Sequence, residues 1–273
     1  MARTDTLDAG KGWSGLADAV PPVPLHLGPR DFRWIESPDG TGKVRLVLKE
    51  IDRQGIAYVV DFRCENRDQA RRLLETAAAE ARAAGARTIR AGFRPFLSCA
   101  FLPEDPPPGW HPVGTFHMMA LRLDASPPPA ILSGPPAMPG LAFRSFLDHP
   151  DLYPELHNRC FEGVFNAARC LPGERDELLA GIREEREEAA AALLDEEPCG
   201  FYRMSLPDGN RSVLLDSLGV LPERRQRGIG RCILAESLRK ARDRGARVDR
   251  LMVADRNTGA LALYRSAGFV EER

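Results

Sequence analysis

The sequence predicts an α/β protein of the α+β type, with mixed sheets flanked by helices and the chain divided into two parts. Apolar runs with strand character alternate with amphipathic helical runs, and a proline-rich stretch interrupts them. A chain of 273 residues can bury two cores. We therefore expect a flexible segment over residues 1–24, a smaller α+β domain over 25–124, a stiff extended linker over 125–140 and a larger mixed-sheet domain over 141–273.

In the first half, the hydrophobic pattern predicts a hairpin, a helix and two further strands. The hairpin would pair residues 44–51 with residues 56–64, the helix would cover 68–84, and the strands would cover 88–93 and 110–123. A glycine lies in the turn between the two arms, as is common in hairpins.

The second half is predicted to begin with a strand and two helices, followed by three strands, a helix and another strand. In that order the expected ranges are 141–146, 151–165, 174–188, 191–194, 200–206, 212–220, 231–244 and 247–254, with a turn over 207–210. The charged run from Glu184 to Glu188 is interpreted as the solvated face of its helix.

A helix followed by Gly-Ala-Arg and a strand occurs twice in the chain. The two copies are Gly85-Ala86-Arg87 and Gly245-Ala246-Arg247. The turn before the first helix, residues 63–67, contains no glycine, whereas the turn before the second helix contains two. Two interpretations fit this pattern. The first half is a degenerate copy of the second half, or it is an unrelated α+β domain that shares a common helix–strand joint.

Composition argues against several classes of protein. A formal net charge of −1 provides no basic field for nucleic acid or for an anionic membrane. The sequence shows no signal-like segment and no apolar run that could span a bilayer, so we expect a cytoplasmic protein. The six cysteines form no C-x-x-C pair and no metal-finger spacing, so we expect reduced thiols and no metal. The sequence leaves open whether the chain is a monomer or a homodimer.

The stretch from Arg225 to Gly230 carries the strongest functional signal. An apolar strand precedes it and an amphipathic helix follows it. Glycines allow the backbone to approach an anion, and the first N–H groups of a helix have no intrahelical partner. With the helix dipole and the neighbouring arginines, these donors predict a diphosphate site. The residues after Gly228 do not match a P-loop, and the third glycine of a dinucleotide fingerprint would fall on Ile233.

The same residues resemble the acyl-CoA signature of the GNAT superfamily of N-acetyltransferases, Q/R-x-x-G-x-G/A after a strand that ends in V-x-P. Here the strand ends at Val220-Leu221-Pro222, and Arg225, Gly228 and Gly230 fill the signature. Further along, the segment from Asn257 to Phe269 resembles the family's N-x-x-A-x-x-x-Y-x-x-x-G-F helix and turn. The resemblance covers residues 141–273 and implies a GNAT-like fold there. A degenerate first half would make the chain a tandem GNAT protein.

The resemblance implies that acetyl-CoA is the acyl donor. It assigns the contacts with acetyl-CoA to Leu218, Gly219, Val220, Arg225, Gln226, Arg227, Gly228, Ile229, Gly230, Arg231 and Asn257. In the family, backbone N–H groups freed by a bulge hold the thioester carbonyl and the pantetheine arm. Gly219 suggests such a bulge or a close approach to the backbone, although an ordinary weak point in a strand is the alternative. Asn257 would bind the pantetheine or cap its helix.

Two side chains are candidates for the chemistry. Tyr264 lies where the family keeps the general acid that protonates the leaving thiolate, and its alternative role is that of a half-buried aromatic. Asp216, predicted to share a strand face with Leu218, is the candidate general base. With an ordinary pKa of about 3.9, an aspartate needs burial or a relaying water to accept an ammonium proton. Glu162 and His157 are alternative bases on a helix expected to cover the acceptor.

These observations lead to one main hypothesis. The chain would be an acetyl-CoA-dependent N-acetyltransferase that moves an acetyl group directly from CoA to a primary amine of a small molecule or peptide. The alternatives are a non-catalytic acyl-CoA sensor and an interaction protein. GNAT folds usually continue through a further strand after the position of Phe269. Here the sheet has fewer strands, the first half supplies one, or the chain has been shortened.

Overall fold

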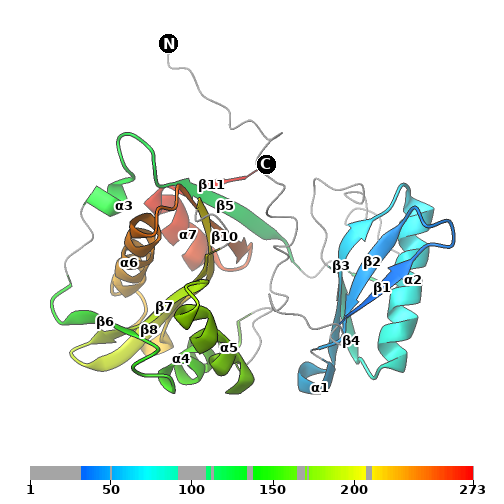
Figure 1. The fold of residues 1–273 in the computed structure, drawn as a ribbon, viewed down its shortest axis with the longest axis horizontal. Helices are drawn as coiled ribbons and strands as arrows, with labels where there is room; N and C mark the ends of the chain where they lie inside the picture. The colour runs from blue at the N-terminus through cyan, green and yellow to red at the C-terminus, as the bar shows by residue number, and fades with distance from the viewer. Residues whose placement is uncertain are drawn as a thin grey trace, which may run out of the picture. The chain divides into compact units, whose positions relative to one another are not determined.

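The computed structural model describes residues 32–49, 51–91, 109–111, 114–133, 138–164, 170, 172–206 and 211–272 (Figure 1). The expected flexible segment over residues 1–24 and the expected turn over residues 207–210 lie outside the described residues. The chain forms two compact units, Met1–Val113 and Gly114–Arg273, and each unit has its own sheet.

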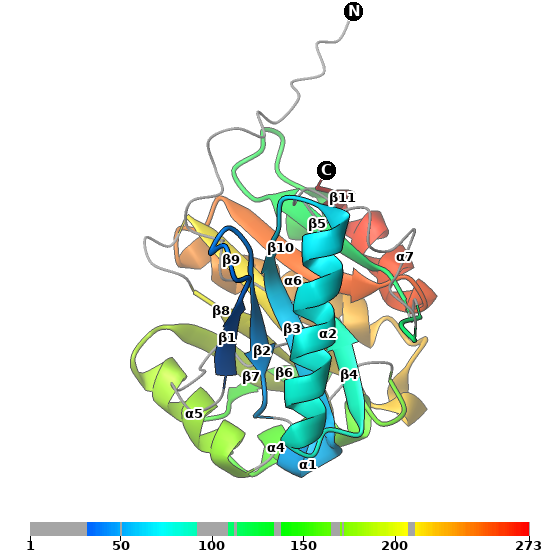
Figure 2. The same cartoon turned by 90° about the vertical axis from the view of Figure 1, so that its right-hand side faces the viewer.

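The first unit is a four-stranded sheet with one long helix against it. In sheet order its strands are β1 (Phe32–Glu36), β2 (Lys43–Val47), β3 (Ile56–Arg63) and β4 (Thr88–Ala91), and its helices are α1 (Ile51–Gln54) and α2 (Arg67–Ala83). Strands β1 to β3 are antiparallel neighbours, and β4 is parallel to β3. Helix α2 lies along one face of the sheet (Figure 2). Its apolar side, including Leu73 and Leu74, packs in one core with Leu46 and Val59.

The second unit is a mixed seven-stranded sheet with helices on both faces. In sheet order its strands are β11 (Val270–Glu271), β5 (Phe116–Arg122), β10 (Val248–Ala254), β9 (Ser212–Val220), β8 (Glu197–Ser205), β7 (Glu187–Leu194) and β6 (Leu141–Ser145). Its helices are α3 (Ala130–Ser133), α4 (Leu152–Cys160), α5 (Pro172–Arg183), the 3-10 turn η1 (Pro222–Arg224), α6 (Ile229–Asp243) and α7 (Thr258–Ala267).

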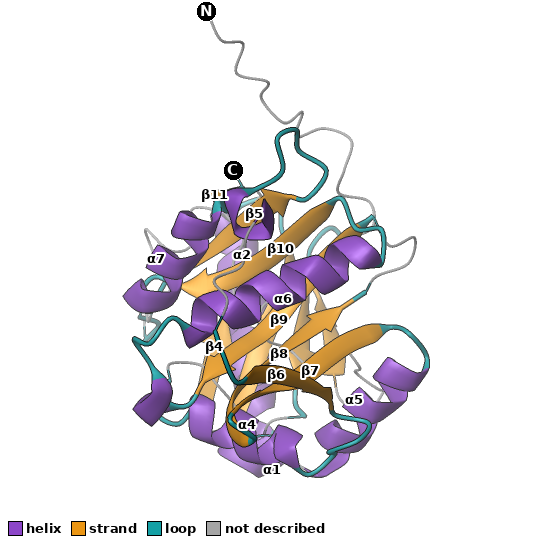
Figure 3. Ribbon diagram, turned by 90° about the vertical axis from the view of Figure 1, so that its left-hand side faces the viewer, coloured by secondary structure: helices purple, strands orange, loops and turns teal. Residues whose placement is uncertain are grey.

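Helices α6 and α7 cover one face of this sheet, and α4 and α5 cover the other (Figure 3). The alternation of side chains along β8 shows the two faces. Tyr202 and Met204 belong to the core under α6 and α7, whereas Phe201 belongs to the core under α4 and α5. The predicted α/β fold, a mixed sheet flanked by helices joined to a smaller α+β unit, is confirmed.

Strand β5 lies in a different sheet from the one expected. The sequence placed residues 110–123 in the first half, but β5 lies between β10 and β11 and is antiparallel to both. The units therefore divide after Val113 and not at residue 124. Of the three explanations for the short end of the chain, the structure shows that a segment from before the linker supplies the strand. Strand β10 offers β5 a free edge, and nothing in the local sequence of β5 specifies that edge.

The segment over residues 125–140 is not simply an extended linker. It contains the one-turn helix α3, in which Ile131 is 1% exposed and belongs to the core under α6 and α7. Burial of this apolar side chain anchors the segment to the second unit.

The charged run after α5 also differs from its prediction. Helix α5 ends at Arg183, and β7 already begins at Glu187. Glu187 is 2% exposed and forms an ion pair with Arg203 on the neighbouring strand, so it does not belong to a solvated helix face. A buried carboxylate of this kind requires a partner, which the sequence pattern did not reveal.

The two units share a strand–helix–strand arrangement. In β3–α2–β4 and in β9–α6–β10 the two strands are parallel. The joints after the helices match in detail. At Gly85-Ala86 and Gly245-Ala246, the glycine N–H donates to the carbonyl three residues earlier and the alanine N–H to the carbonyl five residues earlier, at 2.8–3.1 Å. The two glycines have φ of 94° and 84°, which favours glycine. This correspondence favours the degenerate-copy interpretation of the first half.

One cysteine departs from the expected reduced state. Cys64 is disulfide-bonded, whereas Cys160, Cys170, Cys199 and Cys232 are free and buried. Spacing along the chain does not show which cysteines come close in space.

Candidate functional site

Strands β9 and β10 pair along only part of their length. They are parallel neighbours as far as Leu215 and Leu251, and β9 then continues to Val220 with β8 as its one partner among the described strands. The N–H of Leu221 donates to a β8 carbonyl at 2.9 Å. By alternation, the N–H groups of Val220 and Leu218 point to the side that β10 has left. These donors are suited to bind an extended ligand between the two strands.

A β-bulge marks the point where the strands separate. Arg203 on β8 faces Ser217, but the next residue, Met204, faces Leu215, so Asp216 is the extra residue of β9. The bulge expected in this strand is therefore present, but it lies three residues before the glycine that suggested it.

Gly219 itself does not lie at the bulge. It is paired regularly with Phe201. A Cβ at Gly219 would lie 2.7 Å from Cys160 Cβ and 2.8 Å from Phe201 Cε1. The glycine is thus required by the close approach of α4 to β9, so of the two expectations for this residue the close approach is present and the bulge is not.

The bulge also changes the direction in which Asp216 points. The Ser205 hydroxyl donates a hydrogen bond to its carboxylate, so Asp216 lies on the face covered by α4 and α5. Leu218 and Val220 instead pack against the core under α6 and α7. The expectation that Asp216 and Leu218 share one face is wrong, because the extra residue reverses the alternation.

The environment of Asp216 suits a general base. Although the residue keeps exposed surface, the protein atoms around its carboxyl are dense enough that desolvation raises its pKa to about 6. The guanidinium of Arg203 and the hydroxyl of Ser205 oppose that rise of the pKa. A carboxyl in this state is mostly ionised at neutral pH and binds a proton much more tightly than an ordinary aspartate.

A buried ion pair that the sequence pattern did not predict lies beside Asp216. Arg203 donates from Nε and Nη2 to the two carboxylate oxygens of Glu187 at 2.7 and 2.8 Å, and from Nη1 to the Tyr153 hydroxyl at 3.1 Å. The Glu187 side chain is 3% exposed. The network ties β7, β8 and α4 together on the face of Asp216. Arg203 and Glu187 are not direct partners in the register, because Arg203 lies opposite Ala189 and Glu187 opposite Ser205, so no simple sequence signal marks the pair.

The turn after β9 is shaped to expose backbone donors. Gln226 has φ of 60° and Gly228 has φ of 81°, and α6 starts directly afterwards without a side-chain cap. Among the described residues, the N–H groups of Ile229 and Gly230 have no acceptor, whereas those of the next two residues bond to the Gly228 carbonyl. A free helix start of this kind binds anions.

The corresponding turn of the first unit is closed. The Asn66 side chain accepts from Gln69 N at 2.9 Å, and the Gln69 side chain accepts from Glu65 N at 2.7 Å. The start of α2 is thus capped by its own side chains. Of the two corresponding turns, only the one before α6 keeps the geometry of an anion site.

The three arginines of the α6 turn differ in their partners. Arg225 donates from Nε to the Val220 carbonyl at 3.1 Å and from Nη2 to the Cys160 carbonyl at 2.8 Å. Its main contribution is therefore to brace the turn against β9 and α4. Arg231 makes a contact of 3.4 Å with the Ser266 hydroxyl, and Arg227 is exposed. Arg227 and Arg231 are the better placed to meet phosphate.

Tyr264 lies on α7 and faces the sheet. It is 8% exposed, and its ring centroid lies 5.7 Å from that of Phe269. Burial, and secondly the charge of Asp249, raises the pKa of the Tyr264 hydroxyl above its usual value. Asn257 accepts from Ala260 N at 3.2 Å, so of its two expected roles the helix cap is the one present in the structure.

The two alternative bases are less well placed. His157 lies among aromatic rings, with centroid distances of 5.0 Å to Phe161 and 5.8 Å to Tyr153. Glu162 is exposed just beyond the end of α4. Asp216, at the bulge, lies directly where the strands separate.

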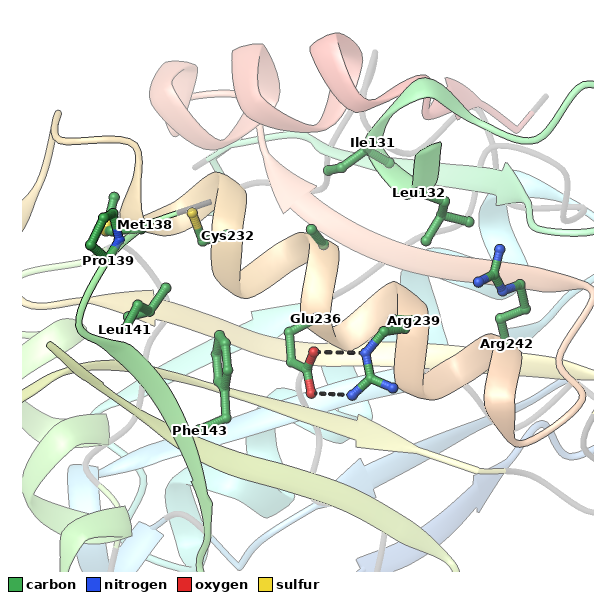
Figure 4. Close-up of a pocket in the computed structure, with 11 residues that line it drawn as sticks. Ile131, Leu132, Met138, Pro139, Leu141, Phe143, Cys232, Glu236, Arg239 and Arg242 are labelled. Carbon is green, nitrogen blue, oxygen red and sulfur yellow. Dashed lines mark hydrogen bonds and ion pairs between the residues drawn. The ribbon is translucent and has the colours of Figure 1, made fainter. Parts of the chain in front are cut away.

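A pocket of about 410 Å³ runs along α6, between that helix, α3 and β6 (Figure 4). Leu132, Leu141 and Phe143 contribute apolar lining, and Glu236 pairs with Arg239 at 2.7 Å. Among the described residues, none from the α6 turn (225–231), the bulge at Asp216 or α7 lines this pocket. The pocket therefore lies apart from the place where β9 and β10 separate.

Residues 151–269 match the acetyltransferase (GNAT) family. This part of the chain is a GNAT acetyltransferase domain. The matched stretch contains the bulge at Asp216, the free start of α6 and Tyr264. The resemblance inferred from the sequence is thereby confirmed for the C-terminal half.

Two curated relatives are mycothiol acetyltransferases. That of Clavibacter sepedonicus is 36% identical over 136 residues, which cover 48% of this chain and 43% of the relative. That of Clavibacter michiganensis subsp. michiganensis (strain NCPPB 382) is 34% identical over 158 residues, which cover 56% and 50%. The match thus spans about half the length of these relatives.

Solved structures extend the similarity to both units of the chain. A tandem GNAT protein from the clavulanic acid biosynthesis pathway has a TM-score of 0.61 and 19% identity, covering 90% of this chain and 82% of that one. A GCN5-related N-acetyltransferase from Sphaerobacter thermophilus has a TM-score of 0.66 and 20% identity, covering 95% and 80%. These similarities show that the chain shares the fold of these proteins. In the part of the chain that the structure describes, no helix is long and apolar enough to cross a membrane.

Proposed function

We propose that the chain is an N-acetyltransferase that moves an acetyl group directly from acetyl-CoA to a primary amine of a small molecule or peptide. The observation that carries this proposal is the separation of β9 and β10 at the Asp216 bulge. The gap between these strands begins at the start of α6, where backbone donors are free. Asp216, the candidate base, lies on one face of the sheet beside the gap, and Tyr264 lies on the other.

The α6 turn would bind the diphosphate of acetyl-CoA. The free N–H groups of Ile229 and Gly230 donate to its oxygens, and Arg227 and Arg231 add charge. From there the pantetheine arm extends along the unpaired side of β9, where Leu218 and Val220 present backbone groups. A donor of this kind polarises the thioester carbonyl and stabilises the oxyanion that forms on attack.

The acceptor would approach from the face covered by α4 and α5, because Asp216 points to that face. Its ionised carboxylate takes a proton from the ammonium and frees the amine for attack. Tyr264 lies on the opposite face and supplies a proton to the departing thiolate. Base and acid thus act from opposite sides of the sheet and do not compete for one proton.

The test is release of free thiol from acetyl-CoA during incubation with a panel of primary amines. The relatives' names make the acceptor of mycothiol acetylation the first member of the panel, alongside aminosugars, polyamines and peptide α-amines. We expect amine-dependent thiol release that Tyr264→Phe slows. Binding of acetyl-CoA with no thiol release for any amine would support the sensor alternative.

A further inference from the structure

Asp249 is a buried carboxyl that neither the acyl-CoA signature nor the proposed chemistry uses. It lies on β10 and is 0% exposed. Within the described residues, neither of its carboxyl oxygens has a hydrogen-bond partner. A buried polar group without a partner destabilises a fold, so its presence at a core position requires an explanation.

The register of β10 places Asp249 beneath α7. Leu251, two residues further along, belongs to the core under α6 and α7, so Asp249 lies on the same face. Its neighbours across the sheet are Leu121 on β5 and Val213 on β9, both in that core. Leu121 Cδ1 lies 3.4 Å from the position that a Cβ of Gly268 would occupy at the end of α7. Asp249 therefore lies beneath the helix that carries Tyr264.

Asp249 interacts electrostatically with both catalytic candidates, Asp216 and Tyr264. Burial, and secondly the charge of Asp216 on β9, raises the pKa of Asp249 well above its usual value, and Arg250 opposes this rise. Arg250 itself pairs with Glu272 at 2.8 Å. From α7, Tyr264 is the titratable group that Asp249 influences. The neighbour on β5 is apolar, and no charged group of α6 is among those that shift this carboxyl.

We propose that Asp249 is a positioning residue for acetyl transfer, a neutral carboxylic acid that donates its proton in a hydrogen bond to the Tyr264 hydroxyl when acyl-CoA is bound. This inference rests on the proposed function. A protonated carboxyl is a hydrogen-bond donor, whereas a carboxylate only accepts. Catalytic hydrogen bonds are often long before the substrate binds and tighten in the complex, which accounts for the unpaired carboxyl in the chain alone.

A hydrogen bond from Asp249 would make the Tyr264 hydroxyl a better proton donor than its burial alone allows. A buried tyrosine with a raised pKa is a weak donor to a thiolate, whose pKa is about 8.5. As the C–S bond breaks and its electron pair stays on sulfur, the sulfur takes the Tyr264 proton, and the hydrogen bond from Asp249 stabilises the negative charge left on Oη. The ammonium nitrogen loses two protons when it becomes an amide. One of these protons restores Tyr264, and the other is taken by Asp216 and leaves to solvent, so the step balances.

Infrared spectroscopy tests the inference without turnover. At neutral pH, the wild-type protein should show the C=O band of a protonated carboxylic acid, and Asp249→Asn and Asp249→Leu should lack it. Binding of CoA should shift this band in the wild type and leave it unshifted in Tyr264→Phe. A missing band at neutral pH, or an equal shift in Tyr264→Phe, would overturn the proposal.

Kinetics with a matched pair of variants completes the test. Asp249→Leu should slow single-turnover transfer about tenfold, the equivalent of one hydrogen bond. Asp249→Asn, which keeps a donor, should recover most of that loss. In a Tyr264→Phe background, Asp249→Leu should have no further effect, and an equal tenfold loss there would overturn the proposal.

Stability separates this role from a structural one. Asp249→Leu removes a buried unpaired carboxyl and should unfold at the same temperature as the wild type or at a higher one. A marked fall would assign Asp249 to the fold and would count against the proposal. If the wild type transfers acetyl to no amine, the proposed function fails, and the infrared result still decides the state of Asp249 and its contact with Tyr264.

Discussion

Gly228, the residue directly before α6, offers the sharpest test of the acyl-CoA site. Its φ of 81° and ψ of −8° lie in the left-handed region, and this conformation leaves the N–H groups of Ile229 and Gly230 free. Alanine at this position strains the turn and places a methyl group beside those donors. We therefore expect Gly228→Ala to weaken both the fold and the binding of CoA.

The structure sets the size of each effect. A Cβ at Gly228 would have Met138 Cε at 3.7 Å as its nearest neighbour, which is ordinary contact, so the loss of stability comes from the backbone alone. A left-handed conformation costs an alanine about 1–2 kcal/mol. Loss of one charge-assisted hydrogen bond to the diphosphate costs about 1.5–3 kcal/mol, which is about tenfold or more in Kd.

Gly245 provides the matched control at the other end of the same helix. Its φ is 84°, and a Cβ there would meet nothing within 4 Å. Gly245→Ala should lose the same stability as Gly228→Ala and keep the wild-type affinity for CoA. Gly230→Ala is a second control, because its Cβ would make ordinary contacts at 3.5 Å with Val220 Cγ2 and at 3.6 Å with Leu263 Cδ2, and the acyl-CoA signature accepts alanine there.

The assay combines urea unfolding of each variant with calorimetric titration of CoA at a temperature where all variants are folded. The reasoning is refuted if Gly228→Ala and Gly245→Ala bind CoA equally well. It is also refuted if Gly228→Ala keeps wild-type stability, because the strain argument would then be wrong.

Further predictions concern the chemistry and the packing. Tyr264→Phe should slow single-turnover transfer about a hundredfold with CoA affinity retained; an unchanged rate would leave Tyr264 with a packing role. Desolvation raises the pKa of Asp216 to about 6, so wild-type kcat/KM should fall as the pH drops through about 6. In Asp216→Asn this fall of kcat/KM at low pH should disappear, and the loss of rate relative to wild type should become smaller at high pH. A loss of rate that does not depend on pH would mean that Asp216 only positions the acceptor. Calorimetry should find one CoA per chain, because Asn66 caps the corresponding helix of the first unit, and two equivalent sites would contradict this. Gly219→Ala brings a Cβ to 2.7 Å from Cys160 Cβ and should cost about 1–3 kcal/mol of stability, so unchanged urea unfolding would argue against close packing there.

Much of the site was predictable because its signals are local. The turn from Arg225 to Gly230 and the helix after it are contiguous in sequence, and their geometry depends on glycine conformations and free helix donors close to them. The same holds for Tyr264 on α7 and for the Asn257 cap. The alternation of strands and helices predicted the class of fold for a similar reason, since periodicity reflects which side of each element is buried.

The sequence by itself therefore determined most of the elements, the fold class and the turn that leaves helix donors free. Only the tertiary structure decided that β5 enters the second sheet, that the bulge lies at Asp216, and that Asp249 is buried beneath the helix of Tyr264. The physical reason is the range of the interactions. A strand pairs with whichever edge the assembled sheet leaves open, and an inserted residue reverses which face each later side chain occupies. The pKa of a carboxyl depends on groups that come near it only when the whole chain has packed.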